Sequence, residues 1–290
     1  MPLPKRQLDK IREIQELQLA TETRMAESLP KIFEELSRQT IDLAADIPLN
    51  PNKRAEALRQ MIDMKRKIAE LVALNPLYQK EVEAVISSYS TFKKLADQYV
   101  GMVFDNYNPK VELYEAILKT NIETTVDNLI GSGIRENFKN AITQVLKENI
   151  SGQSSRTQLN KVLRQFIEGN PDEKPFLERY IKQTTNDSLM GFQREYIQTV
   201  SDDLDLNYYF YAGTLIADSR PFCQARTGRY YTKEQVQSWA SLGDWQGRMA
   251  GTTKITIFTN AGGYNCRHTI WPVSDAQYKQ AEKENVAGMK

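Results

Sequence analysis

Apolar residues recur at helical spacing through the first two-thirds of this chain, which leaves little room there for anything but a helical fold. In the clearest stretch, residues 82–99, they fall at i, i+3, i+4 and i+7 along one face. In the opening segment Pro30 lies inside the pattern, and we expect it to break or kink the helix. The predicted helices are residues 5–45, 51–74, 76–104, 109–130, 134–149, 155–168 and 172–201.

Asn-Pro pairs mark helix starts in this region. An Asn side chain at the N-cap accepts a hydrogen bond from an unpaired backbone N–H, and proline at the first helical position sacrifices no hydrogen bond. The intervals between the pairs are unequal, so they indicate separate helix starts and not the period of a repeat. The pairs are Asn50-Pro51, Asn75-Pro76, Asn108-Pro109 and Asn170-Pro171.

The chain changes character near residue 205. All three tryptophans follow this point, and residues 206–290 carry ten basic and six acidic side chains, a net charge of +4. Short aromatic and β-branched runs there predict strands, and capping residues predict short helices. The predicted strands are residues 206–213, 254–259 and 267–273, and the predicted helices are residues 232–241 and 275–286.

We therefore predict a mostly α chain with a small α+β C-terminal domain. The first domain is a long-helix region over residues 1–205, and the second is a compact α+β module over residues 206–290. A module of this size buries too little surface to be stable alone, so we expect it to pack against the helices.

Composition excludes several classes of protein. Lys and Arg number 38 against 37 Asp and Glu, a net charge of +1, which argues against a dedicated nucleic-acid binder or a membrane-surface protein. No apolar run approaches the roughly 18 residues of a membrane span, and the opening residues lack the apolar core of a secretory signal. Two cysteines provide no disulfide framework and suit a reducing compartment. The single histidine, His268, removes most two-histidine metal sites.

Cys223, Cys266 and His268 admit four interpretations. They could bind zinc with Asp218 as a fourth ligand, form a Cys–His nucleophilic dyad, or pair as a disulfide if the two Cα atoms approach to about 6 Å. The favoured interpretation is that two small thiols and a hydrogen-bonded histidine fill a small core, so we expect no catalytic residue, metal or cofactor. If residues 266–273 form a strand, Cys266 and His268 share one face and Arg267 lies on the other.

A basic surface interleaved with tyrosines is a second candidate site, of the kind that binds single-stranded nucleic acid. Arg226, Arg229 and Lys254 are its candidate contacts. The favoured alternative is that Arg220 and Arg267 are structural and pair with Asp218 and backbone carbonyls. The complete set is Arg220, Arg226, Arg229, Lys254 and Arg267 with Tyr230, Tyr231 and Tyr264. Phosphate-binding glycine loops, HExxH motifs and Ser-His-Asp sets are absent from the sequence.

Two segments of the tail, GTLIADSRPFCQARTGRYY and GGYNCRHTIWPV, closely resemble the C-terminal signature of phage minor head proteins. This head-morphogenesis family includes the F protein of phage Mu. With the stretch 175–213 upstream, the resemblance covers roughly 110–130 residues. Relatives often have cysteine in place of His268 and further cysteines in both motifs, so this departure counts against a metal site. The matching positions are Asp218, Arg220, Cys223, Gly228, Gly263, Asn265, Cys266, Arg267, His268 and Pro272.

The resemblance implies a non-enzymatic minor capsid protein of a tailed phage, present in a few copies per virion near the portal. It implies contacts with the portal protein, the major capsid protein or both, and a role in head assembly and in handling or ejecting packaged DNA. The implied location is the phage head, after assembly in the host cytoplasm. The competing interpretation is a toxin-like effector or nuclease that uses the C-terminal module.

Overall fold

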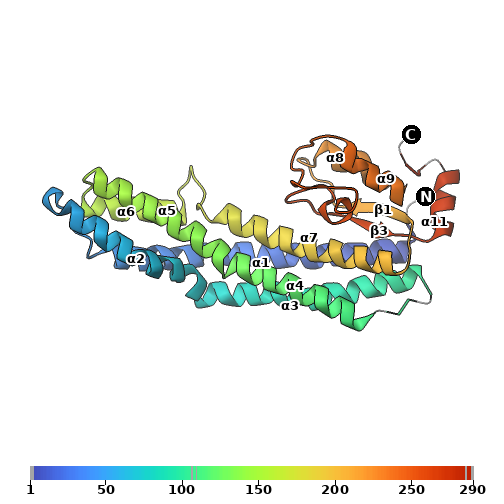
Figure 1. The fold of residues 1–290 in the computed structure, drawn as a ribbon, viewed down its shortest axis with the longest axis horizontal. Helices are drawn as coiled ribbons and strands as arrows, with labels where there is room; N and C mark the ends of the chain where they lie inside the picture. Colours follow the sequence, from blue (N-terminus) through green and yellow to red (C-terminus); the bar gives the residue numbers. More distant parts are fainter. Residues whose placement is uncertain (1–2, 106, 109, 285, 289–290) are drawn as a thin grey trace. The chain divides into compact units, whose positions relative to one another are not determined.

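The computed structural model describes residues 3–105, 107–108, 110–284 and 286–288, and it confirms the mostly helical fold with a small C-terminal sheet (Figure 1). Seven long helices precede the sheet in the described part of the chain. They are α1 (Lys5–Ala44), α2 (Arg54–Leu74), α3 (Pro76–Val103), α4 (Val111–Leu129), α5 (Ser132–Ser151), α6 (Arg156–Glu168) and α7 (Glu178–Asp203).

The structure confirms some of the helix ends predicted from proline and asparagine and contradicts others. Of the two effects expected at Pro30, a break or a kink, the break is wrong, because α1 continues through this residue. Asn50 does cap the short 3-10 turn Pro51–Lys53 that precedes α2, and the Asn75 side chain accepts from the Tyr78 N–H at the start of α3. The predicted start at Pro109 lies outside the described residues.

The last long helix begins later than the pattern at Asn170-Pro171 indicates. The Asn170 side chain accepts hydrogen bonds from the backbone N–H groups of Asp172 and Glu173, and it thereby closes a turn. The α7 helix starts only at Glu178. The Asn-Pro signal is therefore a genuine capping signal here, but what it caps is a turn.

The chain folds into two compact units, and the boundary between them does not fall at residue 205. One unit comprises residues 22–86 and 123–185, and the other comprises residues 1–21, 87–122 and 186–290. Helices α1, α3, α4 and α7 each contribute to both. Residues 206–290 therefore share a unit with stretches of these helices.

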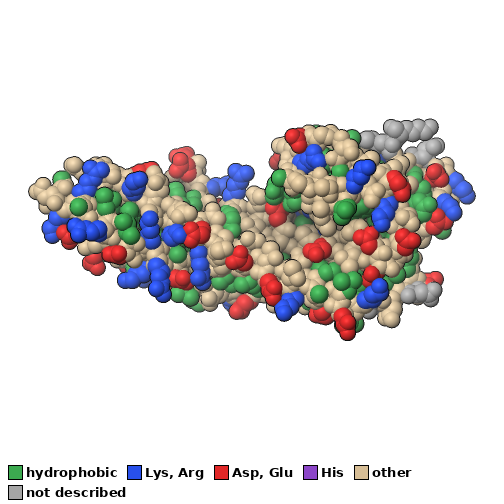
Figure 2. Space-filling view, in the orientation of Figure 1, with side chains coloured by type: hydrophobic (Ala, Val, Ile, Leu, Met, Phe, Trp, Pro, Cys, Tyr) green, Lys and Arg blue, Asp and Glu red, His purple; other side chains and the backbone are tan. Residues whose placement is uncertain are grey.

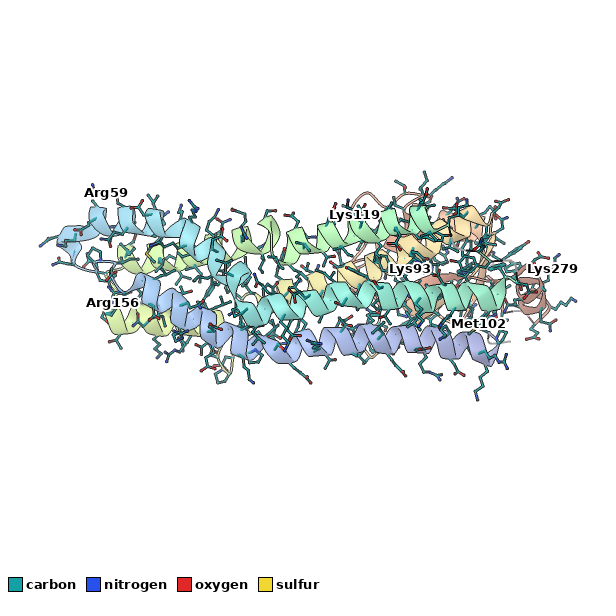
Figure 3. All side chains as sticks on the ribbon, turned by 90° about the horizontal axis from the view of Figure 1, so that it is seen from below. Arg59, Lys93, Met102, Lys119, Arg156 and Lys279 are labelled. Carbon is teal, nitrogen blue, oxygen red and sulfur yellow. The ribbon has the colours of Figure 1, made fainter. Side chains whose placement is uncertain are left out.

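The first of these units is an all-helical bundle. Its core includes four fully buried side chains, those of Ile68 in α2, Phe138 and Ile142 in α5 and Leu163 in α6. Arg156, labelled in Figure 3, donates hydrogen bonds to the carbonyls of Ala44 and Ile47 and so satisfies the end of α1.

The helical part of the second unit has an aromatic core. The rings of Tyr89 and Phe192 lie 4.8 Å apart, and those of Tyr114 and Tyr196 lie 4.9 Å apart. The Tyr196 hydroxyl donates to the Asp97 carboxylate over 2.6 Å, so the polar end of one ring is satisfied inside the bundle.

The sheet of this unit has three antiparallel strands in the order β2-β1-β3. Strands β1 (Tyr208–Gly213) and β3 (His268–Pro272) confirm two predictions, whereas β2 (Tyr230–Thr232) was not predicted. The strand predicted over residues 254–259 is wrong, because that segment is a turn leading into α10 (Ile257–Asn260). The hydroxyls of Thr253 and Thr256 accept hydrogen bonds from nearby backbone N–H groups and close the turn.

One face of the sheet packs on the long helices, as expected for so small a module. Trp271 of β3 lies 4.7 Å from the ring of Tyr99 in α3, whose hydroxyl donates to the Pro272 carbonyl over 2.9 Å. The helix α11 (Asp275–Lys283) follows β3, and its capping box at Ser274 confirms the predicted start. The Gln277 side chain donates to that of Gln7 in α1.

The other face of the sheet is covered by short helices. Helices α8 (Pro221–Arg226) and α9 (Lys233–Ser238) and the 3-10 turn Trp239–Ser241 pack there together with α10. The capping box at Thr232 confirms the predicted start of α9. The shared core consists of Tyr209, Tyr211, Phe222, Cys223, Tyr231, Val236, Trp239, Ile257, Phe258, Ala261, Cys266 and Ile270.

The described helices include none that is both long and apolar enough to cross a membrane. On the face shown in Figure 2, basic and acidic side chains alternate over the helices and form no broad field of one sign. This distribution agrees with the balanced charge of the sequence.

Candidate functional site

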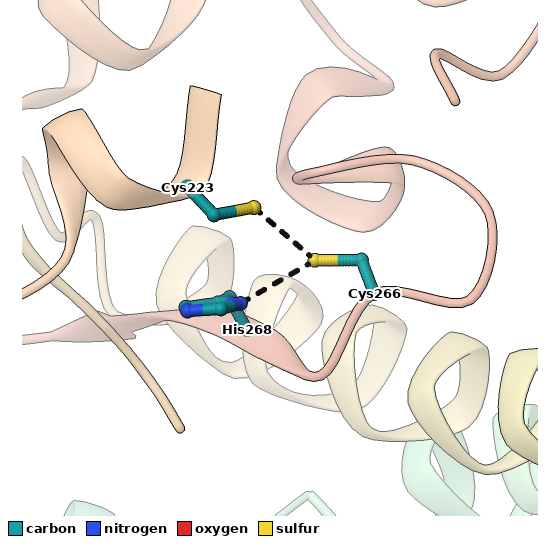
Figure 4. A group of neighbouring side chains, drawn as sticks. All are labelled: Cys223, Cys266 and His268. Atoms are coloured by element: carbon teal, nitrogen blue, oxygen red, sulfur yellow. Dashed lines mark hydrogen bonds between the residues drawn. The ribbon is translucent and has the colours of Figure 1, made fainter. Parts of the chain in front are cut away.

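Cys223, Cys266 and His268 meet in the core beneath the short helices (Figure 4). The Sγ atoms of the two cysteines lie 3.7 Å apart, and Cys266 Sγ lies 3.6 Å from His268 Nδ1. All three side chains are at most 4% exposed, and both thiols are free. The predicted strand over 266–273 begins only at His268, so Cys266 lies in the loop before β3 and reaches His268 from there, not from a shared strand face.

Three elements position these side chains. Cys223 lies in α8, which begins at Pro221 in the first helical position, and His268 is the first residue of β3. Tyr211 of β1 stacks on the His268 ring at 5.3 Å, and its hydroxyl lies 3.4 Å from Cys223 Sγ. Tyr211 of the sheet therefore contacts both the imidazole and the thiol of α8.

Two glycines leave room for the cluster. A Cβ atom on Gly262 would lie 2.5 Å from Cys266 Sγ and 2.6 Å from Cys223 Sγ. A Cβ atom on Gly213, directly opposite His268 in the sheet, would lie 2.4 Å from the imidazole ring. Real Cβ atoms essentially never approach so closely, so a larger residue at either position would force the neighbouring side chains to shift.

Two arginines hold the loop that carries Cys266. Arg194 of α7 is 2% exposed and donates to the carbonyls of Cys266 over 2.6 Å and His268 over 3.0 Å. Arg220 donates to the carbonyls of Gly262 over 3.1 Å and Tyr264 over 2.6 Å. The prediction that Arg220 binds backbone carbonyls is confirmed.

The pKa values of the two thiols are shifted in opposite directions. The hydrogen bond from Cys223, reinforced by His268 and the charge of Arg194, holds the pKa of Cys266 well below its usual value. The same thiol–thiol contact, together with burial, raises the pKa of Cys223. The negative charge of a singly ionised pair therefore resides on Cys266, beside the imidazole.

A pocket of about 400 Å³ opens beside this cluster. Gln15 and Leu19 of α1 form one wall, and Thr214 and Ile216 form part of another. The polar and titratable groups that line it are Asp218, Arg220, Cys223, Asn265, Cys266, Arg267 and His268. Most of the positions singled out by the motif resemblance therefore surround one cavity.

The other motif residues shape the surrounding loops. Gly263 has a φ of +92°, and a Cβ there would lie 1.9 Å from the Gly247 carbonyl oxygen, so the loop requires glycine. The Asn265 N–H donates to the Asp187 carboxylate over 2.6 Å. The Gly228 N–H donates to the Tyr211 carbonyl, and Pro272 accepts from Tyr99 as described above.

The predicted basic and aromatic surface does not form as a whole. Arg226 is 7% exposed, lies 3.9 Å from the Phe222 ring centre and donates to the Phe222 carbonyl, so it cannot be a nucleic-acid contact. Tyr230 and Tyr231 are also buried. Of the remaining members, Arg229, Lys254 and Tyr264 are exposed, whereas Arg220 and Arg267 are half-buried.

Several residues of the site were missed in the sequence. Arg194, Tyr211, Gly213 and Gly262 all contact the cluster or its loop. The only sequence signal for Arg194 is a basic residue inside a predicted helix. Its significance depends on the approach of a loop more than 70 residues further along.

No family model, curated protein or solved structure matches this chain. The structure alone therefore defines the class, a helical protein with a small α+β module enclosing a buried thiol–imidazole cluster.

Proposed function

We propose that this chain is a non-enzymatic minor head protein of a tailed phage, located near the portal and acting in head assembly. The observation that carries the proposal is the joining of the two motif segments in space. Arg220 of the first segment binds the carbonyls of Gly262 and Tyr264 in the second, and Cys223 contacts Cys266. The two cysteines are 43 residues apart in the chain, and nothing about an accidental pair of short matches would bring them together at one cluster.

The long helices supply the surface for docking on the portal or the major capsid protein. Ile62 and Leu74 of α2 are 56% and 63% exposed, and Leu215 and Ile216 of the C-terminal module are 47% and 55% exposed. Single exposed apolar side chains are common on protein surfaces, so each pair is tested by a double substitution. Exposed Arg229 and Lys254 remain the candidate contacts for packaged DNA.

The test is co-purification of the tagged full chain with the portal and capsid proteins of the same genome. We expect a stable complex with the portal protein. The double variant Ile62→Glu/Leu74→Glu weakens it if docking uses α2, and Leu215→Glu/Ile216→Glu weakens it if docking uses the module. Arg59→Glu, which also places a negative charge on the surface of α2, is the matched control.

The competing function has its own signature. Failure to bind either head protein, together with cleavage of DNA or RNA that His268→Ala abolishes, overturns the proposal in favour of a toxin-like nuclease. Failure to bind either head protein without any cleavage also overturns it.

A further inference from the structure

The cluster of Cys223, Cys266 and His268 has the dimensions of a metal site. Zinc binds thiolate sulfur at about 2.3 Å and imidazole nitrogen at about 2.0–2.1 Å, so tetrahedral angles place two sulfurs about 3.8 Å apart and a sulfur and a nitrogen about 3.6 Å apart. The Cys223–Cys266 sulfur separation here is 3.7 Å, and the separation between Cys266 Sγ and His268 Nδ1 is 3.6 Å. The ligand atoms of all three residues lie within 4.8 Å of one another.

From this geometry we infer that Cys223, Cys266 and His268 bind one divalent metal ion with a preference for sulfur and imidazole ligands, and that Zn²⁺ is the ion that fits best. Two thiolates cancel the charge of a divalent ion, so the complete centre is neutral. A neutral centre suits a site whose ligands are all at most 4% exposed. The inference does not depend on a role in a phage head.

The surroundings favour a metal over simple filling of the core. Gly262 and Gly213 bring backbone against both sulfurs and the imidazole, so no side chain occupies the space around the ligand atoms on those sides.

The fourth coordination position faces the pocket. All three ligands line that cavity, whereas the Asp218 carboxylate, although it also lines the pocket, is not among the ligand atoms that cluster within 4.8 Å. The sequence-based choice of Asp218 as fourth ligand is therefore not supported by the geometry. Water from the pocket completes the tetrahedron and can be exchanged for a small ligand.

The first test uses the reduced wild-type full chain and needs no variant. We expect one equivalent of Zn²⁺ to raise the thermal midpoint and to protect both cysteines from alkylation, measured by mass spectrometry. Co²⁺ should give the intense visible bands of a tetrahedral thiolate centre, and azide should shift them. Absence of stoichiometric Zn²⁺ binding by reduced, folded protein overturns the inference.

Variants separate the ligands from their neighbours. Cys223→Ser, Cys266→Ser and His268→Ala should each lose the equivalent of bound Zn²⁺, while Asp218→Asn, the matched control on the pocket wall, should retain it. Circular dichroism identifies a variant that fails to fold, and for any such variant the wild-type cobalt spectrum decides. Retention of tetrahedral cobalt bands by folded Cys266→Ser overturns the site, as does a stable Cys223–Cys266 disulfide in protein purified from a reducing cytosol.

Discussion

Cys223 and Cys266 lie 43 residues apart in the chain, yet their sulfur atoms approach to 3.7 Å without a bond between them. A disulfide requires about 2.05 Å, so this is a contact between two thiols. The contact joins α8 to the loop that precedes β3. A substitution that changes the space around these sulfurs should therefore affect the packing of both segments.

Gly262→Ala should destabilise the protein by about 1–3 kcal/mol, because the added Cβ overlaps both sulfurs and the core must shift to accept it. Gly191→Ala is the matched control. Gly191 lies inside α7, and a Cβ there meets nothing within 4 Å. The control should be neutral or stabilising by up to about 1 kcal/mol. The midpoints of chemical denaturation measure both, and equal midpoints would contradict the proposed close packing.

Arg194→Lys should also destabilise the protein, by about 2–3 kcal/mol, although it retains the charge. A lysine ammonium cannot reproduce the planar fork that reaches the carbonyls of Cys266 and His268, and those buried acceptors lose their partners. The same substitution at exposed Arg179 near the start of α7 is the control and should change little. Hydrogen exchange of residues 262–268 should rise only in the Arg194 variant; unchanged exchange would show that the loop is held by other contacts.

Alkaline pH should unfold the second unit through its buried tyrosines. Burial raises the pKa of Tyr114, Tyr230 and Tyr231 to about 12 in each case, against an ordinary value of 10.0. Because the folded pKa lies above the unfolded one, the neutral rings contribute their full stability below pH 10, and that contribution is lost as the pH rises through about 12. Circular dichroism recorded with tyrosinate absorbance should show loss of structure and ionisation together. Free ionisation near pH 10 in a chain that stays folded would refute the prediction.

The sequence predicted the helices well and the site only in part, for a physical reason. Helical periodicity is local, so the helix bounds agree within a few residues apart from the start of α7. The segment 254–259 has the alternation of a strand, but Ile255 is 82% exposed and threonine hydroxyls turn the chain. The spacing of Cys223, Cys266 and His268 gives no distances. The expectation of no metal rested on the number of ligands and on this chain's departure from the family pattern, neither of which contains the sulfur and nitrogen separations.

Removal of residues 206–290 should also disorder the parts of the long helices that share a unit with the C-terminal module. Tyr99 of α3 stacks on Trp271 and donates to the Pro272 carbonyl, so truncation exposes a ring that is fully buried in the intact chain. Buried aromatic surface of this kind stabilises by roughly 1.5–3 kcal/mol per side chain. We therefore expect residues 87–122 and 186–205 to lose hydrogen-exchange protection in the 1–205 fragment.

The unit formed by residues 22–86 and 123–185 provides the internal control for that truncation. It has its own core, including Phe138 and Leu163, and loses none of its own residues when the module is removed. Its exchange protection should therefore persist in the same fragment, in the same sample. Uniform protection across all helices would mean that residues 1–205 form a self-sufficient domain, as the sequence indicated. Selective loss would locate the folding boundary within the long helices, where the residue ranges of the two units divide.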